Sequence, residues 1–282
     1  MPASPPELPG CIAFIGGGNM ARSLIAGLIA DGVPPASLRV AEPVAVLREA
    51  LREDFGVEVF ADNAIAGAAA TTWVLAAKPQ VLREVCEDLA AQVQLQRPLL
   101  VSIAAGITTA QLDRWLRGEV AIVRAMPNTP ALLGAGISGL FANAQVDAAG
   151  RQCAERLLAA AGETVWLTDE SMMDAVTAVS GSGPAYLFLL AESMLDAARS
   201  EGLPPDVARV LVLQTILGAA RMLTEENATP VELRGRVTSP GGTTQAAIDV
   251  LQVGGFDRMV ADAIHAATER GRQLSLAHDR DG

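Results

Sequence analysis

Three consecutive glycines, Gly16–Gly18, constrain the fold of this chain more than any other feature, because they separate the apolar run Cys11–Ile15 from a helical pattern that extends to Asp31. A strand that ends in a glycine-rich turn and passes directly into a helix is the context of a dinucleotide-binding loop. Gly16 permits the tight turn, and Gly18 lets the backbone approach a pyrophosphate. Ala21 takes the third glycine position of the usual pattern and is small enough for close helix–strand packing.

The rest of the first 168 residues continues this alternation of apolar β-type runs and helical patterns. The further strands are expected at 38–42, 57–60, 72–76, 99–103, 120–124, 137–141 and 164–167. Helices are expected at 45–54, 81–93, 109–116 and 146–161. Alternation at this spacing predicts a parallel sheet covered by helices on both faces. We therefore expect an α/β fold with a Rossmann-like, dinucleotide-binding domain over residues 1–168.

From residue 169 onward the pattern is helical, without a convincing strand. Helices are expected at 171–179, 184–201, 205–226, 230–236, 243–253 and 256–274. Two of them, which contain LFLLAESMLDAA and ARVLVLQTILGAARML, are apolar on more than one face and must therefore be buried. A bundle of this size cannot easily bury them alone, so we predict that residues 169–282 form an all-α dimerisation domain and that the dimer is interlocked. Packing of these helices against the first domain alone is the alternative.

Composition limits the partners and the location. The formal net charge of −11 argues against a nucleic-acid partner, which requires basic surface. The first residues lack a basic segment, and the apolar stretch 12–29 is interrupted by Gly, Asn and Arg. We expect no signal peptide, no membrane span and a cytoplasmic location. Three scattered cysteines and only two histidines predict neither a disulfide framework nor a metal site.

The start of the helix after the glycine loop is the expected pyrophosphate site, with the backbone N–H groups of Gly18, Asn19 and Met20 as donors. Glu42 follows the second strand, where an acidic residue accepts a hydrogen bond from the adenosine 2′-hydroxyl and repels a 2′-phosphate. This position favours NADH over NADPH. Arg39 or Arg48 could instead receive a phosphate, and Glu42 could simply cap the next helix, so both cofactors stay open.

Three further loops follow predicted strands and are expected to line the cofactor, because ligands gather at the carboxyl ends of parallel strands. These loops are Ala76–Pro79, which contains Ala77 and Lys78, Ala104–Gly106, which contains Ala105, and Met126–Pro130, which contains Asn128. The prolines fix the chain, and the small residues leave room for a nucleotide. For each loop taken singly, an ordinary strand-end turn is the alternative.

A late segment, VTSPGGTTQAAI at 237–248, predicts a second kind of ligand site. Pro240 and the two glycines after it interrupt the helical pattern, and a new helix begins near Thr243. A helix start after such a turn has free N–H groups that suit a small carboxylate. Ser239, Thr243 and Thr244 place three hydroxyls at the same point. An ordinary helix start after a loop is the alternative.

With these segments, the chain resembles the pyrroline-5-carboxylate reductase family over nearly its whole length. The resemblance is carried by FIGGGNMA, LAAKPQ, SIAAGI, RAMPNTP, DAVTAVSGSGPAY and VTSPGGTTQAAID. It implies a Rossmann-like first domain, an interwoven homodimer formed by the later helices, and in many members a decamer. It also implies an NAD(P)H-dependent reduction of 1-pyrroline-5-carboxylate to L-proline, the last step of proline biosynthesis.

The resemblance also implies roles for individual residues. Asn63 would contact the adenosine ribose, Ala77, Lys78 and Ala105 would lie along the nucleotide, and Asn128 would lie near the nicotinamide. Pro79 and Gly106 belong to the same loops. Substrate would be bound by Ser239, Gly241, Gly242, Thr243 and Thr244, and Thr244 would also act as the catalytic residue by touching the ring nitrogen. Two positions depart from the family: Ala77 replaces the usual valine, and Asn227 stands where a glutamate is common, with Glu226 beside it.

Three rival functions can be compared with the residues, and the first of them fits poorly. A β-hydroxyacid dehydrogenase shares the domain plan but needs a lysine in the helix after Gly181, and the only lysine of this chain is Lys78. A reductase of a larger cyclic imine would use the same segments. A non-catalytic NAD(P)-binding dimer that senses redox state would need only the glycine loop and the helices.

Overall fold

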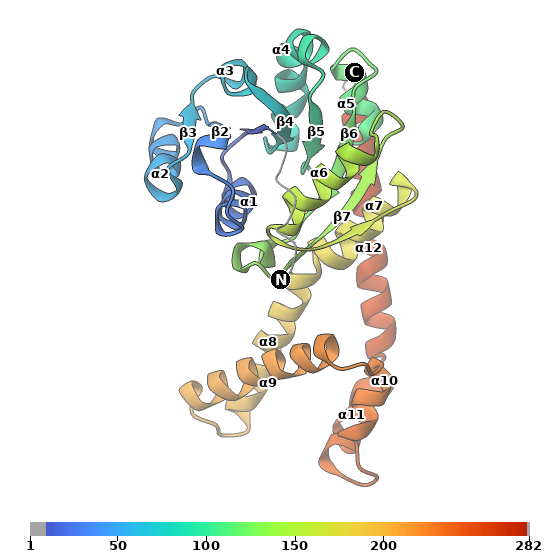
Figure 1. Cartoon of the computed structure of the whole chain (residues 1–282). Helices are drawn as coiled ribbons and strands as arrows, with labels where there is room; N and C mark the ends of the chain where they lie inside the picture. Colours follow the sequence, from blue (N-terminus) through green and yellow to red (C-terminus); the bar gives the residue numbers. More distant parts are fainter. Residues whose placement is uncertain (1–9, 281–282) are drawn as a thin grey trace. The chain divides into compact units, whose positions relative to one another are not determined.

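The computed structural model describes residues 10–280, and side chains as far as residue 276. The expectation that the chain starts without a signal peptide therefore falls on residues outside the described part. The described residues up to Ser182, together with those from Ala267 onward, form one compact unit, here called the sheet unit. Residues Gly183–Ala266 form a second, here called the helical unit (Figure 1). Each unit is described by itself.

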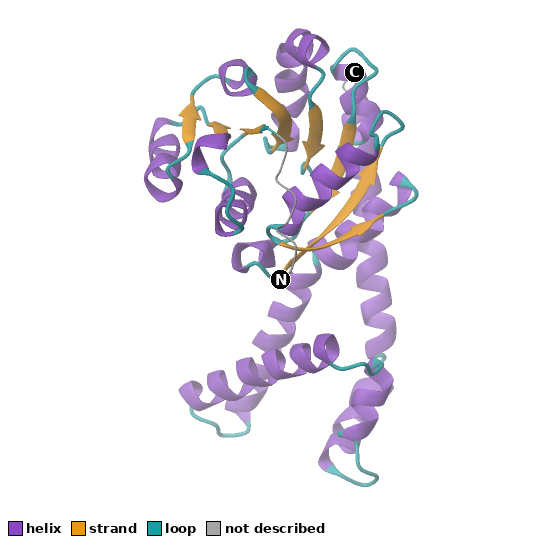
Figure 2. Ribbon diagram, in the orientation of Figure 1, coloured by secondary structure: helices purple, strands orange, loops and turns teal. Residues whose placement is uncertain are grey.

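The sheet unit alternates strands and helices, as its sequence predicts (Figure 2). Its strands are β1 (Cys11–Ile15), β2 (Leu38–Ala41), β3 (Glu58–Phe60), β4 (Ala70–Leu75), β5 (Leu99–Ser102), β6 (Ile122–Met126), β7 (Gly136–Ala142) and β8 (Gly162–Trp166). Its α-helices are α1 (Asn19–Ala30), α2 (Ala45–Phe55), α3 (Asn63–Gly67), α4 (Pro79–Gln96), α5 (Thr109–Trp115), α6 (Ala148–Ala159) and α7 (Met173–Val176). The C-terminal part of α12 (Phe256–Arg280) also belongs to this unit.

One sheet contains all eight strands, in the order β3-β2-β1-β4-β5-β6-β7-β8. The first six run parallel, with β1 paired to β2 on one side and to β4 on the other. This is the doubly wound order in which ligands bind where the strand order reverses, beyond the carboxyl ends of β1 and β4. The expectation of a wholly parallel sheet is wrong at one pair, because β7 runs antiparallel to β6. The connection 127–135 is too short for the crossover that a parallel pair requires.

Two apolar layers bury the two faces of the sheet. Alternate residues of β1 point to opposite faces, so Phe14 packs with α1, α2 and α6, whereas Ile15 packs with α3, α4 and α5. Trp73 of β4 and Phe14 are both fully buried, one in each layer. The expectation of helices on both faces is therefore confirmed.

Capping residues explain where several helices begin. Thr108 and Gln111 form a reciprocal capping box at α5, and Asp147 accepts a hydrogen bond from the Gly150 N–H at α6. The short helix α3, which the sequence pattern did not predict, begins after Asp62, whose side chain accepts from the Ile65 N–H. Without that cap, a helix of this length would be marginal.

The segment predicted as one helix at 171–179 consists of three pieces. A 3₁₀ turn, η3 (Glu170–Met172), leads into α7, and η4 (Thr177–Gly181) follows as a π-helical turn. The Ser182 N–H donates to the Thr177 carbonyl at 2.8 Å, which is the i→i+5 bond of a π turn. Such turns in helices are frequent at functional sites.

The helical unit contains α8 (Gly183–Ser200), α9 (Pro205–Glu225), α10 (Pro230–Arg236), α11 (Thr243–Val253) and the first part of α12. It has almost no core within one chain: α8 has no buried residue, and α9 buries only Ala208 and Val212. Large apolar side chains on both helices are exposed, including Phe188 at 69% and Val210 at 67%. A surface of this kind marks a protein–protein interface.

Among the residues that the structure describes, α9 is the one helix long and apolar enough to cross a bilayer, with a mean hydropathy of 1.4 over the window that qualifies. A single helix of this kind is weak evidence for a membrane, because a helix buried between subunits has the same composition. The exposed apolar faces of α8 beside it favour burial between protein chains.

Candidate active site

The glycine loop lies between β1 and α1, and each of its glycines has a different reason to lack a side chain. Gly16 has φ +109°, and a Cβ there would lie 2.8 Å from the Ala76 carbonyl carbon. A Cβ on Gly17 would lie 2.5 Å from Leu51 Cδ1. Gly18 faces open space, with nothing within 4 Å of the Cβ position. Side chains at Gly16 and Gly17 would therefore come too close to neighbouring atoms of the protein. At Gly18 the space is open and leaves room for a ligand.

The start of α1 suits an anion. Gly18 is the N-cap, and no side chain caps the helix. Gly18 and Asn19 are exposed, and Met20 is half-buried. No described residue accepts from the backbone N–H groups of these three. The arrangement fits a dinucleotide pyrophosphate, which would take donors from the helix start and favourable charge from the helix dipole.

Glu42 follows β2 and is only 7% exposed. Its Oε2 accepts from the Gly17 N–H at 3.3 Å, and its Oε1 accepts from the Val44 N–H at 2.9 Å. The carboxylate thus ties the glycine loop to the segment that opens α2. Glu42 therefore does more than cap α2, because its Oε2 also holds the glycine loop. The rest of its lone pairs leave acceptor capacity for a ribose hydroxyl.

The two arginines considered as phosphate partners are already engaged with the protein. Arg39 donates to the carbonyls of Ala66 and Ile65 and to Glu58, and its guanidinium stacks on the Phe60 ring at 4.3 Å. Arg48 donates to the Glu42 carbonyl at 2.6 Å. Both guanidiniums serve first to hold the β2–α2 region in place.

The other predicted cofactor loops also follow strands at the carboxyl edge. Lys78 is exposed and precedes α4, and Pro79 is the first residue of that helix. Ala105 is exposed, and Gly106 is buried with φ +75°. A Cβ on Gly106 would lie 3.6 Å from Leu274 Cβ, so the C-terminal part of α12 packs beside this loop. Asn63, predicted for the adenosine ribose, is half-buried at the start of α3.

Asn128, in the loop after β6, is hydrogen-bonded to the protein through its side-chain amide. It is 9% exposed, its Nδ2 donates to the Ser180 carbonyl at 3.1 Å, and its Oδ1 accepts from the Ile137 N–H at 3.0 Å. Both ends of the amide are therefore bonded to the backbone. Sequence reasoning could not find these bonds, because Ser180 lies 52 positions further along the chain.

The SPGGTT segment belongs to the helical unit. Gly241 has φ +72°, Ser239 is exposed, and Gly242 is the N-cap of α11 without a side-chain cap. The Gly242 N–H donates to the Ser239 carbonyl at 3.0 Å. No described residue accepts from the Thr243 and Thr244 N–H groups. These two N–H groups, rather than that of Gly242, are the donors available for a carboxylate.

Glu226, considered as a substitute for the family glutamate, ends α9 and accepts from Arg236 at 2.5 Å. The two groups are both partly exposed, so the pair is a surface ion pair with little effect on stability.

Below the carboxyl edge, Arg124 of β6 is buried in an ionic cluster that the sequence did not indicate. Its guanidinium lies 3.1 Å from Glu170 and 3.9 Å from Asp174. Glu170 also accepts from the backbone N–H and the hydroxyl of Thr109, both at 2.7 Å. The cluster joins β6, α5, η3 and α7, and α12 lies beside it, since a Cβ on Gly271 would lie 3.2 Å from Asp174 Oδ1.

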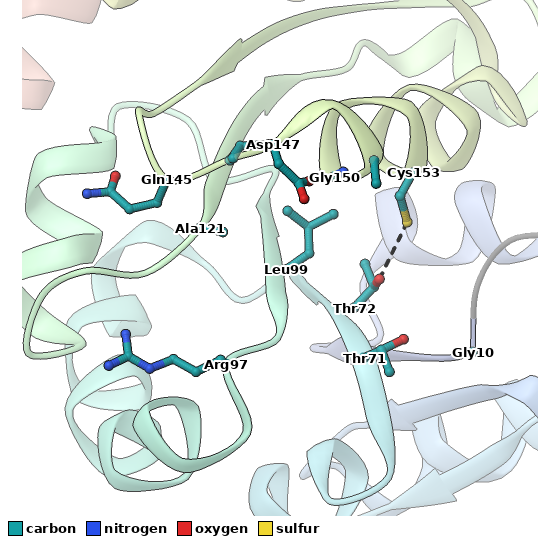
Figure 3. Close-up of a pocket in the computed structure, with 12 residues that line it drawn as sticks. Gly10, Thr71, Thr72, Arg97, Leu99, Ala121, Gln145, Asp147, Gly150 and Cys153 are labelled. Atoms are coloured by element: carbon teal, nitrogen blue, oxygen red, sulfur yellow. Dashed lines mark hydrogen bonds between the residues drawn. The ribbon is translucent and has the colours of Figure 1, made fainter.

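A cavity of about 400 Å³ opens at the opposite, amino edge of the sheet (Figure 3). Thr71 and Thr72 at the start of β4, Leu99 at the start of β5 and Asp147 before α6 line it. Thr72 Oγ1 lies 3.5 Å from Cys153 Sγ. Because ligands of doubly wound folds bind at the carboxyl ends of the strands, this cavity is not the cofactor site.

Comparison with known proteins agrees with this geometry. Residues 170–274 match the family model described as "Pyrroline-5-carboxylate reductase dimerisation". Residues 11–106 match the model described as "NADP oxidoreductase coenzyme F420-dependent". The sheet with its glycine loop and the apolar helices therefore define an NAD(P)H-dependent oxidoreductase that associates with copies of itself.

Two relatives of similar length narrow the class of oxidoreductase. Pyrroline-5-carboxylate reductase from Pseudomonas aeruginosa is 52% identical over 264 residues, which cover 94% of this chain and 96% of the relative. The reductase from Haemophilus influenzae is 43% identical, covering 93% and 97%. The chain belongs to the pyrroline-5-carboxylate reductase family.

Solved structures agree on the fold. The reductase from Coxiella burnetii superposes with a TM-score of 0.91 at 42% identity, covering 94% of this chain and 98% of that one. The enzyme from Plasmodium falciparum, solved with NADP bound, gives a TM-score of 0.84 at 27% identity, covering 95% and 99%. The predicted combination of a Rossmann-like domain and a helical dimerisation domain is confirmed.

Proposed function

We propose that the protein reduces 1-pyrroline-5-carboxylate to L-proline with NADH or NADPH, the last step of proline biosynthesis. The observation that carries the proposal is the start of α11, where Thr243 and Thr244 have hydroxyls and N–H groups from which no described residue accepts. A cyclic imine with a carboxylate has the matching groups: an anion for the N–H groups and a ring nitrogen for a hydroxyl.

The proposed roles of the residues follow from these groups. When bound, the dihydronicotinamide supplies the hydride that adds to the imine carbon. The Thr243 and Thr244 N–H groups and Ser239 hold the substrate carboxylate, with Gly241 and Gly242 shaping the turn. The Thr244 hydroxyl hydrogen-bonds the ring nitrogen. A protonated imine is already electrophilic, so the protein contributes mainly position.

The cofactor residues are proposed as a group at the carboxyl edge of the sheet. The Gly18, Asn19 and Met20 N–H groups bind the pyrophosphate, and Gly16 shapes the turn. Along the nucleotide lie Asn63, Ala77, Lys78, Pro79, Ala105 and Gly106. We propose that Glu42 accepts from the 2′-hydroxyl and that the protein therefore prefers NADH, since its carboxylate would repel a 2′-phosphate.

The proposed working form is a cytoplasmic homodimer, which can assemble further to a decamer. The exposed apolar faces of α8 and α9 support the dimer, because they need a partner to cover them. By function, we propose residues 1–168 as the cofactor domain and 169–282 as the domain for substrate and dimerisation. Sedimentation would test the dimer and the decamer.

The test is a steady-state assay with 1-pyrroline-5-carboxylate and, separately, the six-membered piperideine carboxylate, each with NADH and NADPH. We expect sustained oxidation of the cofactor, with kcat/KM higher for the five-membered imine, and rescue of a proline-requiring strain. Preference for the larger ring would identify a different imine reductase. Cofactor binding without turnover on either imine would identify a non-catalytic binding protein.

A further inference from the structure

The π-helical turn η4 is held against the carboxyl edge of the sheet at three points. A Cβ added to Gly139 of β7 would lie 2.7 Å from Cγ1 of Val176, the residue just before the turn. Gly181 approaches the end of β6 so closely that a Cβ there would lie 2.7 Å from Met126 Cε. Asn128 donates to the Ser180 carbonyl between them. The turn is thus seated at the carboxyl edge of the sheet, which is the edge at which doubly wound folds bind their ligands.

Asn128 links this turn to the sheet through backbone groups alone. Its Oδ1 accepts from the N–H of Ile137 in β7, while its Nδ2 donates to Ser180. It is also the N-cap residue of η2 (Thr129–Leu133). A buried amide with both ends bonded has its orientation fixed. We propose that Asn128 is a positioning residue: it does not touch the cofactor but fixes the end of the η4 turn, at Ser180, and through it the position of the nicotinamide.

This inference rests on the proposed reduction, and it gives Asn128, which is expected near the nicotinamide, an indirect role in place of direct cofactor binding. Pro184, four residues after Ser180, has no backbone N–H, so the Ser180 carbonyl lacks its usual helical donor and an external donor decides where it points. Removing the donor leaves the turn free to change its hydrogen bonding. A shift of a fraction of an ångström at a hydride-transfer site lowers kcat and leaves the binding of the nucleotide, which depends on the glycine loop, unaffected.

The chain contains a matched control. Asn143, just after β7, makes the same pair of bonds at the opposite end of β6: its Nδ2 donates to the Val120 carbonyl at 2.8 Å, and its Oδ1 accepts from the Ile122 N–H at 3.1 Å. Asn143 lies at the amino edge, away from the expected cofactor. Asn128→Asp and Asn143→Asp therefore remove equivalent donors from equivalent clamps, and differ in which edge of the sheet they affect.

Two measurements test the proposal. Hydrogen–deuterium exchange followed by mass spectrometry reports the turn directly: in Asn128→Asp we expect the Ser182 N–H to exchange about 10-fold faster, and in Asn143→Asp no change there. Steady-state kinetics report its effect: we expect kcat about 10-fold lower in Asn128→Asp, with the KM for the nucleotide within about 2-fold of wild type. Asn143→Asp is expected to keep wild-type kcat.

Unchanged exchange of the turn in Asn128→Asp overturns the clamp, whatever the kinetics. Faster exchange with wild-type kcat overturns the positioning role, as does an equal loss of kcat in the two variants. If Asn128→Asp does not fold, Asn128→Ser and Asn143→Ser remove the same two donors without adding a charge, and the same pair of results decides. If the wild type does not reduce the imine, the proposed function fails, and the exchange data still decide whether Asn128 holds the turn.

Discussion

The carboxylate of Glu42 has two separable effects, and substituting it tests both. One is the pair of hydrogen bonds to the Gly17 and Val44 N–H groups, at 3.3 and 2.9 Å, which hold the glycine loop. The other is its charge, which would face the 2′-position of the adenosine. Glu42→Gln keeps the length of the side chain and one acceptor oxygen but removes the charge. Glu42→Ser removes the charge and is too short to reach either N–H.

The expected magnitude follows from Coulomb's law. A phosphate of charge about −1.5 at about 5 Å from a carboxylate is repelled by about 1 to 5 kcal/mol for an effective dielectric constant between about 80 and 20. Screening by salt reduces this to about 1 to 3 kcal/mol, or about 5- to 150-fold. The ratio of kcat/KM for NADH to that for NADPH should fall by this factor in both variants.

The two variants should differ in a second quantity. Hydrogen bonds to a charged group contribute about 1.5 to 3 kcal/mol each, so Glu42→Ser should weaken both cofactors together while Glu42→Gln weakens them less. Dissociation constants from fluorescence titration, with kcat/KM for each cofactor, provide both numbers. Glu49→Gln, an exposed position on α2, controls for the change in net charge. A cofactor ratio that stays at the wild-type value in both Glu42 variants would refute the proposed contact with the 2′-position.

Three further predictions concern the substrate, the ionic cluster and the thiols. Thr244→Ala should lower kcat/KM for the imine by about 10- to 100-fold, since one charge-assisted hydrogen bond is lost, and wild-type turnover would remove Thr244 from the mechanism. Burial raises the pKa of Asp174 above its ordinary value of 3.8, against the lowering influence of Arg124 and Arg272 and with a small contribution from Glu170 and Glu269. The free energy of unfolding should therefore fall as the pH rises from 3.8 through the raised pKa of the folded state. Urea denaturation at a series of pH values should show a smaller fall in Asp174→Asn. The same dependence on pH in the variant and the wild type would contradict this prediction. Burial raises the pKa of the Cys86 thiol to about 12, so this thiol should react with a disulfide reagent at pH 8 only after unfolding. If peptide mapping shows that Cys86 is labelled rapidly in the native protein, the thiol is not buried.

Much of the fold could be predicted because its signals are local. The apolar run at Cys11–Ile15 and the helix starts at Pro205, Pro230 and Thr243 were predicted at the positions where the structure has them. Proline and glycine mark these boundaries through their own backbone geometry, without help from distant residues. The short α3 was missed, because its only signal is the cap at Asp62.

Features that depend on contacts between distant segments could not be predicted. The direction of β7 follows from the length of a connection, and alternation of apolar residues is the same in both directions. The reason for Gly17 is Leu51, a residue of α2 that lies across the loop. The bonds of Asn128 require that 128, 137 and 180 meet. The proposed roles of the site residues in binding stay predictions.

The helical unit has almost no core within one chain, so the folding of this protein should depend on its concentration. Because α8 buries nothing within its own chain, this part gains most of its apolar burial only on meeting a second copy. Mass action then governs its thermodynamics: dilution should lower the melting temperature, and newly synthesised chains should stay aggregation-prone until they find each other. A cell that makes little of this protein would hold a disproportionately small share of it in native form.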